Sequence, residues 1–337
     1  MNLRKGMKNL AGKILKTETQ QDQNTTPQPK KEFTAMIAVT YRCQCRCEHC
    51  GSGFYVKDKD TELTTKELND LMADFAKIGA TSTSYFGGEP MLRKDLPEII
   101  HTASSLGMGT VVDTNAVAIT EEKAKILAEA GLNVASISLD TTIPEKHDKF
   151  RGVPGTWQNA VNAIKLCKAN GIEPHISTYV DREKLNNGEF ADLLKLGKDL
   201  GAKVRVLAPV LAGRWCSEES FKLTPDEIQR MKSMLVPGES FWEQPSCNGA
   251  DKGFFCAATK KNMLYVTAYG DVCPCAYIPL SFGNIRKEPL EDIVKRMWEH
   301  KMFSKPDFND CPMNNPEFKE NFGKKFRNAT HFPVPEN

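Results

Sequence analysis

The sequence lacks several features that would place it in a specialised class. It has no uninterrupted apolar run long enough to cross a bilayer, which argues against a membrane-spanning protein. Its formal net charge is only +2, so it lacks the basic excess that favours nucleic acid, and we expect no nucleic-acid partner. Residues 1–16 lack the apolar core and cleavage site of a secretory signal, so we expect a cytoplasmic protein.

Cysteine, by contrast, is plentiful, with 11 in 337 residues. A disulfide framework is typical of small secreted domains, and this chain is neither small nor provided with an export signal. In a reducing compartment, clustered cysteines are more often ligands of a metal or an iron–sulfur cluster. We interpret as ligand candidates the clustered or suitably placed cysteines, which are Cys43, Cys45, Cys47, Cys50, Cys256, Cys273 and Cys275.

Residues 1–33 are predicted to be a basic N-terminal segment followed by a flexible linker. In residues 1–16, apolar side chains recur at helical spacing, with basic side chains on the other faces. This pattern suits an amphipathic helix in peripheral contact with an anionic membrane surface, or on a partner. The alternative is a frayed, solvated terminus, and the sequence leaves both hypotheses open.

Residues 34–215 alternate short apolar runs with amphipathic runs. Six such repeats predict parallel strands joined by right-handed helical crossovers. The run AMIAVTY at 35–41 is typical of a buried strand, and residues 64–79 carry apolar side chains at helical spacing behind a threonine cap. The pattern alone predicts an α/β fold and does not decide between an open doubly wound sheet and a partial barrel.

After residue 215 this rhythm stops. Residues 216–315 contain two predicted helices and a stretch rich in Gly, Pro and Cys, so we expect a small second module held together by a metal centre. Residues 316–337 are predicted to form a polar, basic tail.

Three cysteines with the spacing CxxxCxxC follow the first predicted strand: Cys43, Cys47 and Cys50. In parallel α/β folds, sites form where loops leave the carboxyl ends of strands. Three thiolates can hold three irons of a [4Fe–4S] cluster and leave the fourth iron open to a small chelating ligand. Cys45, in the same loop, is an alternative fourth ligand. A zinc site is another alternative, although zinc usually requires a second nearby pair of ligands.

A second motif, Phe86-Gly-Gly-Glu-Pro90, ends the second predicted strand. Its glycines expose backbone polar groups and allow a ligand to approach closely, and the Glu89 carboxylate can pair with an ammonium group. Alone this motif would be weak, but it follows CxxxCxxC by one strand–helix unit.

Together the two motifs resemble those of the radical S-adenosylmethionine (radical SAM) superfamily. The resemblance covers roughly residues 34–215 and implies a partial (β/α)6 barrel of the TIM type. It implies that Cys43, Cys47 and Cys50 bind the cluster that cleaves S-adenosylmethionine, and that the GGEP segment binds the amino group of the methionine moiety.

Further segments also resemble motifs of this superfamily, but their matches are less specific. His49 stands where the family usually has an aromatic residue, and its imidazole can still stack near the adenine. The ends of the third and fourth strands resemble TNG-type and SLDG-type turns, for which capping of the next helix is the alternative role. The residues thereby implied to bind the cofactor are His49, Gly87, Gly88, Glu89, Pro90, Thr114, Asn115, Ser138 and Asp140.

The C-terminal cysteines resemble the opening of the SPASM and twitch modules, which carry auxiliary [4Fe–4S] clusters. The order Cys256, Gly270, Cys275 matches this opening, and the glycine would allow a hairpin that brings both thiolates together. The resemblance implies one auxiliary cluster, with Cys247 and Cys311 completing the ligands and Cys273 as a substitute for Cys275. A zinc site formed by the same cysteines is the alternative.

The implied activity is reductive cleavage of S-adenosylmethionine to a 5′-deoxyadenosyl radical, which abstracts hydrogen from a substrate, with net oxidation or modification at carbon. An external reductant, flavodoxin or ferredoxin, is implied. The substrate class stays open among a small molecule, a lipid and a peptide. Because residues 1–33 are too short for a winged-helix leader-recognition domain, a peptide maturase would need a separate leader-binding partner. Non-catalytic alternatives are an iron–sulfur electron carrier or redox sensor, and a scaffold that binds S-adenosylmethionine without cleaving it.

Overall fold

A nine-stranded sheet organises the computed structural model, which describes residues 33–55, 61–207, 223–243, 256–303, 311–318, 320–321 and 332–336. The strand order is β7-β6-β5-β4-β3-β2-β1-β8-β9. All neighbours are parallel except β8 and β9. The first six strands are β1 (Thr34–Thr40), β2 (Ser82–Gly87), β3 (Gly109–Thr114), β4 (Val134–Ser138), β5 (Glu173–Tyr179) and β6 (Lys203–Leu207).

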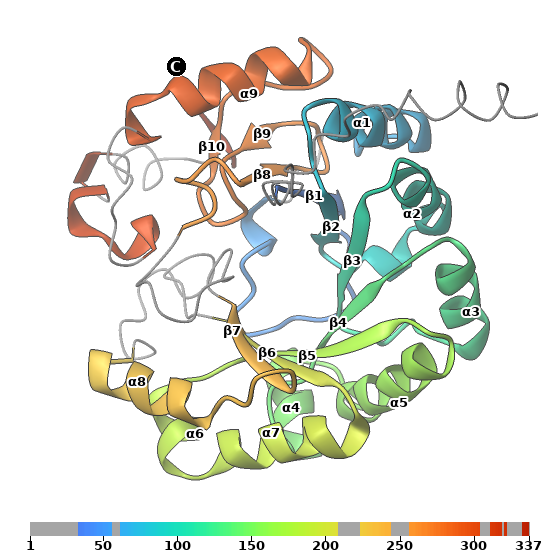
Figure 1. Ribbon diagram of the computed structural model, residues 1–337, viewed down its shortest axis with the longest axis vertical. Helices are drawn as coiled ribbons and strands as arrows, with labels where there is room; N and C mark the ends of the chain where they lie inside the picture. The colour runs from blue at the N-terminus through green and yellow to red at the C-terminus, as the bar shows by residue number, and fades with distance from the viewer. Residues whose placement is uncertain are drawn as a thin grey trace, which may run out of the picture. The chain divides into compact units, whose positions relative to one another are not determined.

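Helices lie on the outer side of this curved sheet (Figure 1). One long helix joins each pair of consecutive strands among these six. In each of the last two connections, a short helix precedes the long one. The long helices are α1 (Thr65–Lys77), α2 (Leu96–Ser105), α3 (Glu121–Glu129), α5 (Thr156–Ala169) and α7 (Glu189–Leu200), and the short ones are α4 (Pro144–Arg151) and α6 (Arg182–Asn186). The predicted alternation of six strands with helices and the partial barrel are thereby confirmed.

Helix α1 shows how local sequence produces this layer. The Thr64 side chain accepts a hydrogen bond from the backbone N–H of Glu67 at 3.3 Å, and the Glu67 carboxylate accepts one from the Thr64 N–H at 2.8 Å. This capping box satisfies two donors that the first turn would otherwise leave open. The apolar face predicted from the spacing is buried, and each such side chain contributes about 1.5–3 kcal/mol. Its members are Leu68, Leu71, Met72 and Phe75.

The strands alternate between an apolar outer face and a polar inner face. In β6, Val204 and Val206 belong to the buried core, whereas Arg205 between them reaches Asp113 of β3 and Ser136 of β4. Since successive side chains of a strand point to opposite faces, Arg205 lies on the side away from the helices. At this level the inner face carries charged groups, where a filled barrel would carry branched aliphatic side chains.

The sheet has three strands beyond the six that the sequence predicts, and two of these pair directly with the edges of the six. β7 (Ser240–Glu243) pairs with β6, and β8 (Met263–Val266) pairs with β1 on the opposite edge. Each has only four residues. Runs this short give little periodic signal, and their pairing depends on sheet edges that are distant in sequence.

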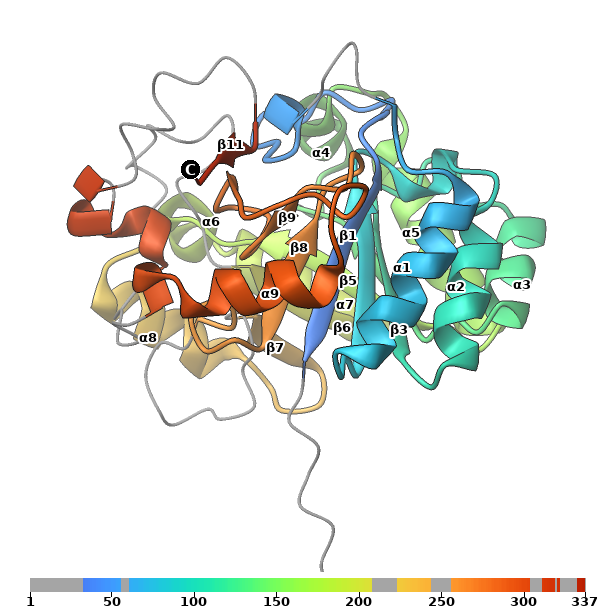
Figure 2. The same cartoon turned by 90° about the horizontal axis from the view of Figure 1, so that it is seen from above.

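The remaining C-terminal elements are also short. They are α8 (Pro225–Met234), β9 (Val272–Cys273), β10 (Leu280–Ser281), α9 (Leu290–Glu299) and β11 (Val334–Pro335), with 3-10 turns at Gly53–Tyr55, Pro90–Leu92, Lys301–Phe303 and Pro312–Asn314. Helix α9 runs beside β8 and β9 (Figure 2) and buries Leu290, Ile293, Val294 and Met297. β11 pairs with β10, so part of the predicted tail joins a small second sheet.

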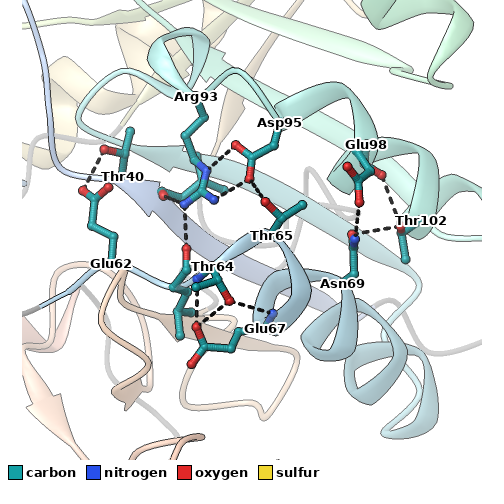
Figure 3. A network of polar contacts seen from close by, with 12 residues as sticks. Thr40, Glu62, Thr64, Thr65, Glu67, Asn69, Arg93, Asp95, Glu98 and Thr102 are labelled. Atoms are coloured by element: carbon teal, nitrogen blue, oxygen red, sulfur yellow. Dashed lines mark hydrogen bonds and ion pairs between the residues drawn. The ribbon is translucent and has the colours of Figure 1, made fainter.

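An ionic network fastens the segment before α1 to the end of β1 (Figure 3). Arg93 binds Asp95 through two nitrogens and donates to the carbonyl oxygens of Val39 and Leu63 at 2.9 and 2.8 Å. Leu63, Arg93 and Asp95 also border an open hollow of about 500 Å³ whose lining includes Arg42, the residue before Cys43. The network therefore holds the chain in place where it enters the cysteine loop.

Some of the sequence-based predictions concern residues that the structure does not describe. The amphipathic segment 1–16, the linker and Cys247 lie outside the described residues. None of the helices in the described ranges combines the length and apolar character that a membrane crossing requires.

Candidate functional site

The four N-terminal cysteines lie in the loop that leaves the carboxyl end of β1. Two backbone hydrogen bonds fasten this loop to the end of α4, because Arg46 and Glu48 donate to the carbonyl oxygens of Arg151 and Phe150 at 2.9 and 3.1 Å. Cys43 is exposed, whereas Cys45, Cys47 and Cys50 are half-buried. The motif thus lies beside the ends of β1 and α4 and is open to a ligand.

The surroundings of these thiols favour two thiolates. Hydrogen bonding with the Cys45 side chain lowers the pKa of Cys43 and lowers the pKa of Cys47 to about 6. Arg151 supports the lower pKa of Cys47, since its Nη1 lies 3.7 Å from Cys47 Sγ. The same hydrogen bonds raise the pKa of Cys45. The three thiols of Cys43, Cys45 and Cys47 therefore interact with one another, and thiolate is the form of cysteine that binds a cluster.

Asn115, at the end of β3, connects the cysteine loop to the neighbouring strand ends. Its Nδ2 lies 3.6 Å from Cys43 Sγ, and its Oδ1 accepts a hydrogen bond from Gln44 at 3.1 Å. Its backbone N–H donates to Glu89 at 2.7 Å. Two of the predicted site segments therefore meet the cysteine loop through one side chain.

Glu89 of the GGEP segment is fully buried. Its carboxylate accepts hydrogen bonds from the Thr114 hydroxyl at 2.7 Å and from the backbone N–H groups of Asn115 and Met91 at 2.7 and 3.0 Å. Burial raises the pKa of Glu89, while the Thr114 and backbone hydrogen bonds act in the opposite direction. The contacts that the structure shows for Glu89 fix the ends of β2 and β3 against each other, and its pairing with an ammonium group stays a prediction.

The two glycines of GGEP allow this segment to lie directly against the chain before Cys43. A Cβ on Gly88 would lie 2.3 Å from the carbonyl oxygen of Arg42, and one on Gly87 would lie 2.3 Å from that of Thr40. Gly87 also has a φ of 124°, which side chains disfavour. Only glycine permits this close approach, which supports the interpretation of the motif as a backbone ledge beside the cysteine loop.

A buried ion pair lies behind the cysteine loop. Arg151 Nε donates to Asp140 Oδ2 at 2.7 Å, and His147 Nδ1 lies 3.3 Å from the same oxygen. Burial alone would raise the pKa of Asp140, but Arg151 and the adjacent His147 side chain hold it well below its ordinary value. Asp140 therefore orients Arg151 toward Cys47. Its predicted contact with the ribose or substrate, and that of half-buried Ser138, stay predictions.

His49 belongs to an aromatic group between the loop and β5. Its ring stacks on Phe150 at 4.7 Å between centroids and lies 5.7 Å from Tyr179. Burial, with Arg151, lowers the pKa of His49 to about 3, so its imidazole is neutral and can stack with an aromatic ligand.

Lys184 is a site candidate that the sequence does not reveal. Its ammonium lies 3.4 Å from the centroid of Tyr179 and donates to the carbonyl oxygen of that residue at 3.3 Å. The residue is only 4% exposed, and burial lowers the pKa of the amine to about 8. A lysine in a short polar helix normally indicates a solvated surface, so only the tertiary packing identifies this buried cation near Asp140.

The donor set of the cysteine loop fits an iron–sulfur cluster by its chemistry. Thiolates are the usual ligands of such clusters, and the loop supplies three in the required order with two of them electrostatically favoured. Across the described ranges, no three His, Cys, Asp or Glu side chains are gathered so as to hold a single metal ion. The fit thus rests on ligand type and position and not on a preformed ion cage.

The predicted hairpin between the C-terminal cysteines is present. β8 and β9 are antiparallel, and Gly270 between them has a φ of 91°, a value that favours glycine. Cys273 is fully buried within an aromatic cluster, whereas Cys275 lies beyond it, where the charge of Cys256 acts on it. Burial raises the pKa of Cys275 to about 12. Half-buried Cys311 precedes the 3-10 turn Pro312–Asn314.

Two family models match the chain. The model of the radical SAM superfamily matches residues 37–197, and the model of the SPASM domain, an iron–sulfur cluster-binding domain, matches residues 256–329. The first range contains the cysteine loop and GGEP, and the second contains four of the C-terminal ligand candidates, Cys256, Cys273, Cys275 and Cys311.

Curated relatives match along most of the chain. An AdoMet-dependent heme synthase from Oleidesulfovibrio alaskensis is 28% identical over 307 residues, which cover 83% of this chain and 79% of the relative. A PqqA peptide cyclase from Rhizobium meliloti is 27% identical over 291 residues, which cover 80% of this chain and 75% of the relative. Both relatives are thus similar to the barrel and to the C-terminal segment together.

Solved structures show the same fold. The crystal structure of Streptococcus suis SuiB bound to precursor peptide SuiA has a TM-score of 0.66 at 15% identity, covering 82% of this chain and 66% of that one. At this identity the likeness concerns the fold alone, and it supports the partial barrel with a C-terminal extension.

Proposed function

Because the chain belongs to the radical SAM superfamily and carries a SPASM domain, we propose that Cys43, Cys47 and Cys50 hold the [4Fe–4S] cluster at which it cleaves S-adenosylmethionine. The radical SAM domain binds a [4Fe–4S] cluster and S-adenosylmethionine, and the SPASM domain binds auxiliary iron–sulfur clusters. When bound, the first cluster supplies the electron that breaks the sulfonium bond and yields a 5′-deoxyadenosyl radical, which abstracts hydrogen from the substrate.

One observation carries the proposal: Asn115 touches both motifs. Its side chain contacts Cys43 Sγ at 3.6 Å, and its backbone N–H binds Glu89 at 2.7 Å. A molecule held at the open iron would therefore lie beside the GGEP ledge, where its amino group meets backbone acceptors. Pairs of charged groups at such a site fix the orientation of a bound amino acid moiety.

Each of the remaining polar residues would have its own role in binding S-adenosylmethionine. Thr114 locks the Glu89 carboxylate, and Asp140 holds Arg151 beside Cys47. Arg151 and Lys184 are buried cations that can orient a carboxylate. The neutral His49 ring offers a stacking face for the adenine. In these roles the residues would keep water away from the reactive carbon of the bound S-adenosylmethionine and would hold that carbon in one orientation.

The alternative of a four-cysteine electron carrier makes Cys45 a ligand. The CxxxCxxC spacing of the radical SAM motif is formed by Cys43, Cys47 and Cys50 and leaves Cys45 out. An electron carrier would also need no glycine-rich segment beside the cluster for binding a ligand, whereas Gly87 and Gly88 lie directly against the chain before Cys43. Both arguments favour the hypothesis that three cysteines, and not four, bind the cluster.

The C-terminal cysteines complete the proposal. Cys256, Cys275 and Cys311, together with Cys247, would hold one auxiliary cluster. The chemistry that such a cluster would supply is one-electron acceptance, which would make the reaction a net oxidation. An external one-electron reductant, flavodoxin or ferredoxin, would start each turnover.

Anaerobic incubation of the reconstituted protein with S-adenosylmethionine and dithionite tests the proposal. We expect 5′-deoxyadenosine to accumulate with the wild type and not with Cys47→Ala. Equal amounts in both would contradict it, because the cluster ligated by Cys47 is then not the source of the electron.

A second, finer candidate is the maturation of a peptide. The 27% identity to a PqqA peptide cyclase over 80% of the chain supports it, while the 28% identity to a heme synthase supports a small-molecule substrate instead. Coexpression with short open reading frames from the same operon tests the peptide hypothesis. Loss of two hydrogen atoms from one peptide, absent with Cys47→Ala, is the expected result, and unchanged peptide masses would count against it.

A further inference from the structure

The cysteine loop contains a buried hydrogen-bond acceptor that no group among the described residues satisfies. It is the side-chain oxygen Oε1 of Gln44, the residue between Cys43 and Cys45. This atom is shielded from solvent, so water at the surface of the protein does not reach it. A buried polar atom without a partner costs free energy, and native proteins seldom leave one unpaired. The acceptor therefore calls for a donor that this structure does not contain.

The neighbours of Gln44 fix the orientation of its amide. Asn115 Oδ1 accepts a hydrogen bond from the backbone N–H of Val117 at 3.1 Å, so this atom is the oxygen of the Asn115 amide. Gln44 Nε2 donates to the same oxygen at 3.1 Å. Exchanging nitrogen and oxygen in Gln44 would set two acceptors against each other. Oε1 is therefore the end of the Gln44 amide that is left without a donor.

The cysteine loop itself does not supply the missing donor. Thiolates and the sulfides of an iron–sulfur cluster accept hydrogen bonds, so a bound cluster would not satisfy Gln44 Oε1. The Nδ2 group of Asn115 already faces Cys43 Sγ at 3.6 Å. An N–H or O–H group of a bound molecule would complete the arrangement.

The position of Gln44 along the sheet narrows the choice of this group. Gln44 bonds to Asn115 at the end of β3, and the Asn115 N–H binds Glu89 of GGEP at 2.7 Å. β3 is next to β2, whereas β5, whose Tyr179 lies beside the His49 ring, is two strands further along in the other direction. In the proposed site, GGEP takes the amino acid moiety and His49 faces the adenine. Gln44 is therefore on the side of the amino acid moiety.

We infer that Gln44 Oε1 accepts a hydrogen bond from the amino group of S-adenosylmethionine. This inference rests on the proposed function for the identity of the bound molecule. It makes Gln44 a binding residue that favours a ligand with an amino group, in addition to the GGEP segment. Asn115 is then the positioning residue that holds the Gln44 amide with its oxygen free.

Equilibrium binding of two uncleavable ligands to the reconstituted full chain tests the inference. The ligands are S-adenosylhomocysteine and its deamino analogue, which has hydrogen in place of the amino group. The ratio of their Kd values measures the preference for the amino group. Gln44→Met removes the acceptor and should reduce this preference by about two- to tenfold, the effect of losing one hydrogen bond. The Kd of the deamino ligand should change little.

Gln44→Glu separates ligand binding from a structural role. This variant also loses the donor to Asn115, but it keeps an oxygen at the acceptor position and adds a charge that favours an amino group. We expect it to keep or raise the preference. Loss of the preference in Gln44→Glu would overturn the inference, because Gln44 would then act only by holding Asn115. This result decides the matter even if Gln44→Met does not retain its iron.

Gln158→Met is the matched control, because Gln158 is exposed on α5 and bonds to Asn162 at 2.9 Å. It should leave both Kd values unchanged. An unchanged preference in Gln44→Met would overturn the inference and would assign the partner of Oε1 to a water molecule.

The 5′-deoxyadenosine assay on the wild type is independent of these binding measurements. A preference that depends on Gln44, without formation of 5′-deoxyadenosine, would refute the proposed cleavage alone. Formation of 5′-deoxyadenosine with a preference that does not depend on Gln44 would refute the role of Gln44 alone.

Discussion

Arg286 and Glu67 form a two-pronged ion pair between the C-terminal segment and the first turn of α1, with nitrogen–oxygen distances of 2.5 and 3.0 Å. Arg286 also donates to the carbonyl oxygen of Thr61 at 2.8 Å. The Glu67 carboxylate is at the same time the acceptor of the α1 capping box. One side chain therefore both starts a helix and attaches the C-terminal segment to the barrel.

This pair predicts an acid-sensitive contribution to stability. Arg286 and the Thr64 hydrogen bonds lower the pKa of Glu67 to about 2, against an ordinary value of 4.5. A carboxyl with a depressed pKa in the folded state stabilises above its unfolded pKa, and this contribution is lost as pH falls from about 4.5 toward 2. Glu67→Gln should lower the free energy of unfolding by about 1 kcal/mol at neutral pH, and by less at about pH 3.

Urea unfolding of both proteins at the two pH values checks this. Glu291→Gln is the control, because Glu291 also joins α1 through Lys77 but is 65% exposed. It should change the free energy of unfolding little at either pH. A deficit of Glu67→Gln that does not shrink in acid would contradict the assigned ion pair.

Gly88→Ala is expected to disrupt binding of S-adenosylmethionine. Its Cβ would lie 2.3 Å from the Arg42 carbonyl oxygen and 2.6 Å from that of Tyr41, so the backbone before the cysteine loop must move. Gly109→Ala is the matched control, since its Cβ would meet Ser82 at an ordinary 3.6 Å. Equilibrium binding should show at least about a tenfold higher Kd for Gly88→Ala only, and equal Kd values would show that the ledge is not part of the site.

Thr114→Val should weaken the same binding through Glu89. The substitution removes the 2.7 Å hydrogen bond to a fully buried carboxylate. An unsatisfied buried acceptor costs about 1–3 kcal/mol, so we expect lower stability and a higher Kd for S-adenosylmethionine. Thr110→Val, in the same strand and equally buried, loses a hydrogen bond to Gly131 and should lower stability alone. A Kd unchanged by Thr114→Val would remove Glu89 from the binding site.

We expect substitutions of neighbouring cysteines in the cysteine loop to differ in their effect on the response to S-adenosylmethionine. Cys43→Ala and Cys47→Ala should abolish the S-adenosylmethionine-dependent change in the electron paramagnetic resonance spectrum of the reduced protein. Cys45→Ala should retain it, because the CxxxCxxC spacing takes its three ligands from Cys43, Cys47 and Cys50. Loss of the spectral change in Cys45→Ala as well would mean that Cys45 is a ligand, as in an electron carrier.

The auxiliary cluster predicts a change in iron content. Cys256→Ala combined with Cys275→Ala should lower the iron bound by about four atoms per chain and leave the spectral response to S-adenosylmethionine intact. Cys273→Ala tests the substitute ligand, and Cys167→Ala, in the buried core of α5, is the control with full iron content. Full iron content in the double variant would exclude these two cysteines as ligands, while a loss in Cys273→Ala alone would assign the ligand to Cys273.

The repeating part of the fold was predictable from local patterns. Helix α1 carries its apolar residues at helical spacing behind Thr64, and β1 is a continuous apolar run, so their types follow from periodicity. β7 and β8 were not predictable, because four-residue strands lack such a pattern and take their places from the edges offered by β6 and β1.

The sequence by itself determined which chemistry is predicted: the order of Cys43, Cys47 and Cys50 predicts a ligand set and the adjoining glycines predict a close backbone approach, because both depend on short spacings along the chain. Only the tertiary structure decided which distant groups face each other. Arg205 and Asp113 are 92 residues apart, and Lys184 becomes a buried cation only through packing against Tyr179. Such contacts arise from the closure of the sheet, which brings together side chains whose positions in the sequence carry no mutual signal.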